Sequence, residues 1–288
     1  MHVGILHPGL MGETLAANCS GQTMWVADGR SAETRQRAQQ NDITEIATLA
    51  ELCERADMIV AICPPAAAVE LAADVANLGY EQLYIDANAI SPGAARAIGR
   101  AFEHFVDGSV IGPPAHAPGT TRLYLSGERA TEVAALFRGS ALDARTLNGD
   151  VGAASALKMA YASWTKIGAA MQLAIRALAS AEGVDEALVE EWALSQQGLV
   201  DRSERAARGV APKAWRFTGE MEQIADAFAS AGLPTGFADG ANDIYRRLAA
   251  FKGVDAVQVG AQMLDQVIDT LLAVPGAENQ VDVESASD

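Results

Sequence analysis

The chain has 288 residues, of which 50% are hydrophobic, so it is long enough for two globular domains with substantial cores. Its formal net charge at pH 7 is −16, and only four of its 21 basic residues are lysines, which argues against a nucleic-acid partner. No apolar run approaches the roughly 20 residues that span a bilayer, so we expect no membrane partner. Three cysteines, Cys19, Cys53 and Cys63, match neither a disulfide framework nor a zinc site, which predicts no metal and a reducing, cytoplasmic location.

Residues 2 to about 130 alternate short apolar runs with amphipathic helical segments. This alternation predicts an α/β fold, a Rossmann-like doubly wound domain whose parallel sheet is covered by helices on both faces. We expect its strands at residues 2–6, 23–27, 58–62, 83–86, 105–110 and 122–126.

After Gly152 the strand signals stop and Ala-rich helical sequence begins, so we expect an all-helical C-terminal domain. A long helix is predicted from Ala153 through Ile167 and on toward Glu182. Further helices are expected at residues 186–196, 218–231, 239–251 and 257–273. The predicted domains are a dinucleotide-binding domain at 1–150, a helical substrate and dimerisation domain at 151–275, and a disordered acidic tail at 276–288. Because the long helix is apolar around much of its circumference, we expect it to pack against a second copy in a homodimer.

The segment His7-Pro8-Gly9-Leu10-Met11-Gly12 follows the first expected strand and begins the first expected helix. This is the context of the dinucleotide motif Gly-x-Gly-x-x-Gly, here with histidine in place of the first glycine. Pro8 could hold the tight turn, provided that His7 leaves the strand in an extended conformation. Many joints of this kind bind nothing, but the strand and helix context favours a cofactor site whose candidate residues are Gly9, Leu10, Met11 and Gly12.

The second expected strand is followed by Asp28, Arg30 and Ser31, where the adenosine ribose of a dinucleotide would lie. An acidic residue would pair with the ribose hydroxyls of NAD, whereas an arginine beside a hydroxyl would bind the extra phosphate of NADP. Both are present, and Arg30 with Ser31 favours NADP while leaving NAD possible. The alternative is that Asp28 and Ser31 only start the next helix and that Arg30 is solvated.

Four segments follow one another in a recognisable order: residues 9–12; residues 84–92; residues 106–112 with 119–120 and 126–127; and residues 149–152 followed by Lys158 on the long helix. Together they resemble the 3-hydroxyacid dehydrogenase and 6-phosphogluconate dehydrogenase superfamily, in a subgroup with its own helical C-terminal domain. The resemblance implies an NAD(P)-dependent oxidoreductase that transfers a hydride between the nicotinamide and a small 3-hydroxy acid or a related alcohol or carbonyl compound. We assign Cys63, Pro64 and Asn88 to the cofactor site as well.

The resemblance implies that Lys158 is the catalytic lysine. Its neighbours from Ala153 to Tyr161 are almost all apolar, so we expect its amine in a crevice, as a general acid or base. Tyr161 lies three residues further along the helix and could share the proton transfer. The alternatives are a lysine that reaches out of a domain interface and an aromatic ring that only packs.

The substrate segment departs from the superfamily pattern. Ile111-Gly112-Pro113-Pro114 stands where well-known members read Ser-Gly-Gly, which removes a hydroxyl and two N–H donors for a substrate carboxylate. We therefore take as substrate-binding candidates Ile111, Gly112, Pro113, His116, Arg216 and Glu220. Arg216 could replace the lost donors or be a surface cap, and His116 could bind a substrate oxygen or be solvated.

Two other functions fit the same features. One is an imine or keto reductase, because related folds reduce C=N bonds when the carboxylate site is altered. The other is a non-catalytic nucleotide sensor, which a lysine in an apolar setting argues against, since burying that group costs free energy. In each case we expect a small-molecule ligand.

Overall fold

The computed structural model describes residues 1–273, and the tail predicted at 276–288 lies outside the described residues. The chain forms two compact units, the first being Met1–Ala162 with Gln223–Pro234 and the second Ser163–Glu222 with the residues from Thr235 onward. The boundary we expected, between residues 150 and 151, precedes the helix Ala153–Ala162, which the first unit includes. Residues 223–234 join that unit too, and Gln223 Oε1 accepts the Ser91 N–H at 2.8 Å.

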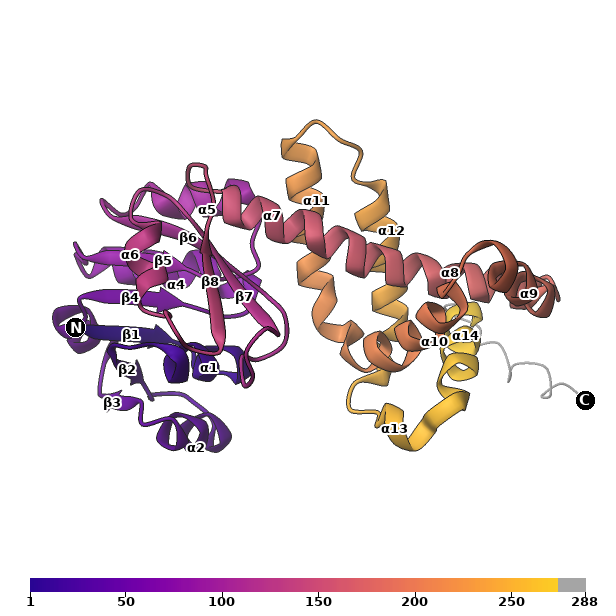
Figure 1. Cartoon of the computed structure of the whole chain (residues 1–288), viewed down its shortest axis with the longest axis horizontal. Coiled ribbons are helices and arrows are strands. Elements are labelled where there is room, and N and C mark those ends of the chain that lie inside the picture. The colour runs from indigo at the N-terminus through magenta and orange to yellow at the C-terminus, as the bar shows by residue number, and fades with distance from the viewer. Residues whose placement is uncertain (274–288) are drawn as a thin grey trace, which may run out of the picture. The chain divides into compact units, whose positions relative to one another are not determined.

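The first unit contains an eight-stranded sheet in the order β3-β2-β1-β4-β5-β6-β7-β8 (Figure 1). Its strands are β1 (His2–Leu6), β2 (Gln22–Val26), β3 (Thr44–Ile46), β4 (Met58–Ala61), β5 (Leu83–Asp86), β6 (Phe105–Ile111), β7 (Thr121–Ser126) and β8 (Leu142–Thr146). The predicted doubly wound α/β fold is therefore confirmed. The sheet has a core on each face, and the neighbouring β4 residues Ile59 and Val60 belong to opposite ones.

Helices connect the strands of the first unit. They are α1 (Leu10–Asn18), α2 (Ala32–Gln40), α3 (Leu49–Arg55), α4 (Ala68–Asn77), α5 (Pro92–Gly99), α6 (Ala130–Ala135) and α7 (Ala153–Ala162). A short 3-10 segment, Pro65–Ala67, precedes α4. Both faces of the sheet are thus covered by apolar residues, as the continuous apolar strand sequences predict.

The sheet departs from the prediction in two ways. First, β7 runs antiparallel to β6, because the connection of residues 112–120 is too short for the crossover of a dozen or more residues that a parallel pair needs. Second, β3 and β8 were not predicted, and they lie at the two edges of the sheet. Both are short and partly polar, as edge strands commonly are, so an apolar pattern does not reveal them.

The second unit is helical over its described residues. Its helices are α8 (Gly168–Ala181), α9 (Asp185–Ser195), α10 (Leu199–Val210), α11 (Phe217–Ser230, whose later part belongs to the first unit), α12 (Gly236–Arg247), α13 (Ala256–Val259) and α14 (Met263–Leu272). A π-helical segment, Ser163–Ile167, joins α7 to α8, and 3-10 segments cover Ala211–Arg216, Leu248–Phe251 and Gly260–Gln262. No helix within residues 1–273 is both long enough and apolar enough to cross a membrane.

Two details of the second unit correct the sequence analysis. Helix α10 was not predicted; it begins after Gly198, whose φ of 77° lies in the left-handed region. The helix expected at residues 257–273 is broken at Gly260, where φ is 61°. A glycine adopts such a φ without strain, so the chain turns there between α13 and α14.

Helices α8, α9 and α10 are held together by a buried arginine. The Arg176 guanidinium binds both carboxylate oxygens of Asp185, at 2.6 and 2.7 Å, and donates to Ser203 Oγ at 3.0 Å. Its planar donors suit such a two-point contact, and Arg176 is only 7% exposed. This network fixes α8, α9 and α10 of the second unit relative to one another.

Candidate active site

The glycine turn lies where the strand order reverses. Strand β1 pairs with both β2 and β4, so its carboxyl end is the switch point at which doubly wound sheets bind ligands. A Cβ on Gly12 would lie 2.7 Å from His7 O and 3.0 Å from Ile62 Cγ2, so only glycine lets α1 pack this closely. A Cβ on Gly9 would meet nothing within 4 Å, and the backbone there is open.

His7 does not leave β1 in an extended conformation, and this expectation was wrong. Its φ is 66°, in the left-handed region that the motif's first glycine would adopt without strain. Its carbonyl accepts the Gly9 N–H at 2.7 Å, which tightens the turn. The buried Nδ1 atom has no hydrogen-bond partner. Burial and the positive charge of Arg30 lower the pKa of His7 to about 4.

The polar residues that follow β2 differ in their contacts. Ser31 Oγ caps α2 by accepting the Thr34 N–H at 3.3 Å, as the alternative interpretation of this residue expected. Asp28 is exposed. Arg30 is half-buried, and its Nε is a buried donor without a partner. An anionic ligand would satisfy that donor.

The residues that follow the carboxyl ends of β1 and β2 fit a pyridine nucleotide. Helix α1 begins at Leu10 with no side-chain cap, so the amide groups of its first turn are available to a diphosphate. Gly9 leaves room for it, and Arg30 offers an unpaired guanidinium N–H. Leu10 is 60% exposed, whereas Met11 packs partly into the core below.

Asn88 connects the ends of two neighbouring strands. Its Oδ1 accepts the Cys63 N–H after β4 at 2.5 Å, while its own N–H and Nδ2 donate to the two Asp86 oxygens at 3.0 and 2.9 Å. Burial, with a further contribution from Asp86, raises the pKa of the Cys63 thiol to about 12, so it is not a thiolate nucleophile at neutral pH. Pro64 is exposed beside it. Asn88 therefore fixes the backbone that follows β4 and β5.

Asp107 lies on β6, within residues 106–112, and the sequence alone assigned it no role. It is fully buried, and its carboxylate accepts the N–H groups of Gly152 and Ser155 at 2.9 and 3.0 Å. It also accepts the hydroxyls of Ser126 and Ser155, at 3.0 and 2.6 Å. Asp107 thus caps α7 from another strand. No local spacing signals such a long-range cap.

Lys158 lies one turn beyond this cap, on α7. Its Nζ donates to the carbonyl oxygen of Val110 on β6 at 2.7 Å, and the residue is half-buried. Ser155 shares this helix face. Tyr161, three residues further on, is 48% exposed. The structure therefore places the amine of Lys158 at the carboxyl end of β6, next to Ile111.

The connection from β6 to β7 has few free backbone donors. Ile111 is buried as the last residue of β6, and Pro113 and Pro114 have no N–H. The Ala115 N–H is taken by Thr14 Oγ1 at 3.1 Å. This loop is further fixed to α1, because Asn18 Nδ2 donates to Ala115 O at 3.0 Å.

Two other substrate candidates have contrasting settings in this loop. Gly112 has φ of 130°, and a Cβ there would lie 2.9 Å from Thr121 Cα, so the close approach of the returning chain requires glycine. His116 is exposed. Of the two, only His116 presents a side chain that can bond a ligand.

Arg216 and Glu220 both belong to the second unit. The Glu220 carboxylate is 2.7 Å from Lys166 Nζ in an ion pair that is largely buried. The guanidinium of Arg216 lies 5.7 Å from the centre of the Phe217 ring, and the Arg216 residue is exposed. Lys166 was not a sequence candidate, because its pairing with Glu220 joins residues far apart in the chain.

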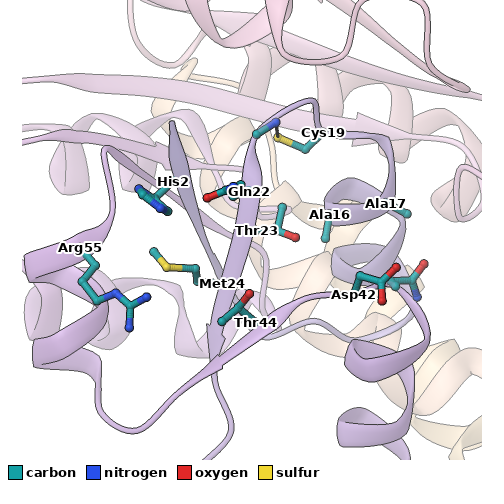
Figure 2. A pocket seen from close by; sticks show the side chains of 12 residues that line it. His2, Ala16, Ala17, Cys19, Gln22, Thr23, Met24, Asp42, Thr44 and Arg55 are labelled. Carbon is teal, nitrogen blue, oxygen red and sulfur yellow. Dashed lines mark hydrogen bonds between the residues drawn. The ribbon is translucent and has the colours of Figure 1, made fainter.

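A cavity of about 430 Å³ opens at the opposite end of the sheet (Figure 2). It is lined by His2, Gln22 and Thr44, which begin strands β1, β2 and β3. The glycine turn follows the other end of β1, so this cavity is not part of the candidate site. Among residues 1–273, no three His, Cys, Asp or Glu side chains gather as a metal-binding set.

Solved structures share this architecture. The chain aligns over 94% of its length with 99% of the 3-hydroxyisobutyrate dehydrogenase of Mycobacterium tuberculosis, at 19% identity and a TM-score of 0.69. It aligns over 92% with 99% of that from Salmonella typhimurium, at 19% identity and 0.63. An imine reductase from Bacillus cereus aligns with 94% of this chain and 98% of its own, at 14% identity and 0.54. At identities below 25%, what the chain shares with these proteins is the fold.

Two segments of the chain match family models. Residues 2–90 match the family described as NADP oxidoreductase, coenzyme F420-dependent, and residues 179–248 match a domain of unknown function, DUF1932. No curated protein matches the chain. The match over residues 2–90, which include the glycine turn, is to a family of NADP oxidoreductases.

Asp86 should make the stability of the protein depend on pH. Burial, with a smaller effect of the Asp107 charge, raises its pKa from 3.8 to about 7, although hydrogen bonds from Asn88 oppose the shift. The folded state therefore binds more protons than the unfolded state between these values. The free energy of unfolding should fall as pH rises from about 4 to 7, by up to about 1.4 kcal/mol per pH unit.

We expect Asp86→Asn to flatten this decline in urea unfolding of the full chain at pH 5, 6 and 7. Glu103→Gln, at an exposed carboxylate, is the matched control and should keep the parental profile. An equal decline in the Asp86 variant would show that another group titrates.

Proposed function

We propose that the chain transfers a hydride between NADP(H) and a small 3-hydroxy acid or a related alcohol or carbonyl compound, with Lys158 as the general acid or base. The observation that carries this proposal is the Lys158 amine, held 2.7 Å from Val110 O in the same unit as the glycine turn. A cytoplasmic location and a small-molecule substrate are parts of the proposal. A panel of hydroxy acids, ketones and imines with each nucleotide tests it.

In this reaction the bound nucleotide supplies or accepts the hydride, and the protein handles the proton. In reduction, the Lys158 ammonium donates a proton to the substrate carbonyl oxygen as it becomes a hydroxyl. In oxidation, the neutral amine takes that proton back. The Val110 carbonyl orients Nζ, and the Asp107 cap fixes the helix that carries it. Tyr161 is the second candidate for proton transfer.

An imine or keto reductase is the second candidate function, and the β6–β7 connection favours it. Pro113 and Pro114 lack amide hydrogens, and Ala115 already donates to Thr14, so a substrate carboxylate finds little backbone support here. The similar fold of an imine reductase is in line with this possibility. Turnover of neutral ketones or imines, with none of hydroxy acids, would decide for it.

We also propose that a second copy covers one face of α8. Met171 and Leu178 are 52% and 62% exposed and lie seven residues apart, hence on the same face, and half-buried Ile175 lies between them. Trp164, seven residues before Met171, is 72% exposed. Apolar side chains at intervals of seven are typical of a seam that packs against another helix.

Lys158→Met should lower turnover about 100-fold to 10,000-fold, the usual contribution of a positioned general acid or base. Methionine keeps the length of the apolar stem, so folding and nucleotide affinity should change little. Lys213→Met, at an exposed lysine of the second unit, is the control and should keep parental turnover. If Lys158→Met stays within a few-fold of the parent on its true substrate, Tyr161 or His116 becomes the proton donor to test.

Arg30→Ala should weaken NADP binding about 10-fold to 100-fold, because it removes a charge-assisted contact with the 2′-phosphate. NAD lacks that phosphate, and its affinity should change little. Isothermal titration of both nucleotides measures the difference. Equal losses would mean that Arg30 is structural and that Asp28 binds the ribose.

Met171→Glu should dissociate the proposed homodimer, since a carboxylate buried in an apolar seam loses its hydration. Sedimentation of the parent and variant across a micromolar range, with nucleotide present, measures this. Ser180→Glu, at an exposed position on the face of α8 opposite to Met171, is the control and should remain dimeric. A monomeric parent would remove the proposal.

A further inference from the structure

His7 carries three unfavourable features at one position. Its backbone is in the left-handed region, which is disfavoured for a residue with a Cβ. Its Nδ1 is buried without a partner, and the positive charge of Arg30 acts on its ring. A glycine would have none of these features, so what the histidine adds at this position is its imidazole.

Arg30 shares the same surroundings from a different strand. It follows β2, its Nε is buried without a partner, and its charge acts on Cys63 after β4 as well as on His7. Because β1 and β2 are parallel neighbours, the residues that follow their carboxyl ends lie along the same side of the sheet. Two nitrogen groups in this region, each with a buried atom that has no hydrogen-bond partner, are suited to an anion.

The other titratable groups near this edge do not supply that anion. Glu13 on α1 lies 3.5 Å from Arg37, and Asp86 on β5 is bonded to Asn88. Asp28 after β2 is exposed, and the Cys63 thiol keeps its proton at neutral pH because burial raises its pKa. A ligand must therefore bring the negative charge.

We propose that His7 is a phosphate ligand of the cofactor site, whose imidazole binds the 2′-phosphate of NADP(H) together with the Arg30 guanidinium. This inference rests on the proposed function, and it assigns to the histidine a task that the first glycine of the motif cannot perform. Free His7 is neutral at physiological pH, because its pKa is about 4. A phosphate dianion beside it favours the imidazolium, so NADP binding takes up a proton.

The test uses the full chain and the variants His7→Gly and His7→Asn. Asparagine tolerates the left-handed region but cannot take up a proton, so it keeps the test valid if the glycine variant fails to fold. Isothermal titration with NADP, NAD and 2′,5′-ADP at pH 6, in two buffers of different ionisation enthalpy, gives affinity and proton uptake. Thermal unfolding without ligand gives stability.

We expect both variants to bind NADP and 2′,5′-ADP about 10-fold to 100-fold more weakly and to lose the parental proton uptake, while NAD affinity changes less than threefold. His7→Gly should unfold about 2–4 °C higher, because the backbone strain is gone. Stability and affinity thus move in opposite directions.

Parental affinity for 2′,5′-ADP in both variants would overturn the inference while leaving the proposed function intact. Equal losses for NADP and NAD would overturn it as well, because His7 would then act on the turn shared by both nucleotides. A parent chain that binds neither nucleotide would overturn the proposed function itself, and the inference with it.

Discussion

The site depends on one buried carboxylate. Asp107 accepts hydrogen bonds from two backbone amides and two serine hydroxyls, which join β6, β7 and the start of α7. Burying a charge is costly unless its hydrogen-bonding capacity is met, and four donors meet it here. The same contacts fix both the axial position and the rotation of α7, since the bonded amides are Gly152 and Ser155. Lys158 follows within one turn, so the lysine amine is placed by an interaction in which the lysine takes no part.

A second buried hydrogen-bond network lies at the carboxyl ends of the parallel strands. Asn88 and Asp86 join the ends of β4 and β5 through bonds to the Cys63 backbone and to each other. Each network satisfies polar groups inside an apolar sheet, which makes the edge stiff in the place where a nucleotide is expected to lie. The glycine turn adds a third fixed point, because the contact between Gly12 and His7 leaves no room for a side chain. The proposed reaction needs a hydride donor at the carbon and a proton donor at the oxygen of one carbonyl group, and a stiff edge serves that requirement.

Local patterns in the sequence predicted much of this. Apolar runs located six strands to within one residue at each end, and the resemblance located Lys158 on a helix beside the sheet. The features that were missed depend on contacts between distant residues or on backbone angles. Nothing near Asp107 indicates that its acceptors serve a helix 45 residues away, and nothing near His7 indicates a positive φ. Edge strand β8 was missed for a related reason, because a strand paired on one side need not be apolar.

The first unit positions Lys158, the proposed proton donor, but offers few backbone groups to the far end of a substrate. Beyond Ile111 the chain offers two prolines and an amide already bonded to Thr14, so backbone groups contribute little to binding an acid. In the proposed function, selectivity must then come from side chains, and the exposed His116 is a polar candidate in this loop. Because Thr14 and Asn18 of α1 fix Ala115 in the same loop, side chains beyond it can change without moving Lys158 or the glycine turn. The proposed proton transfer and the choice of substrate would then depend on separate parts of this unit.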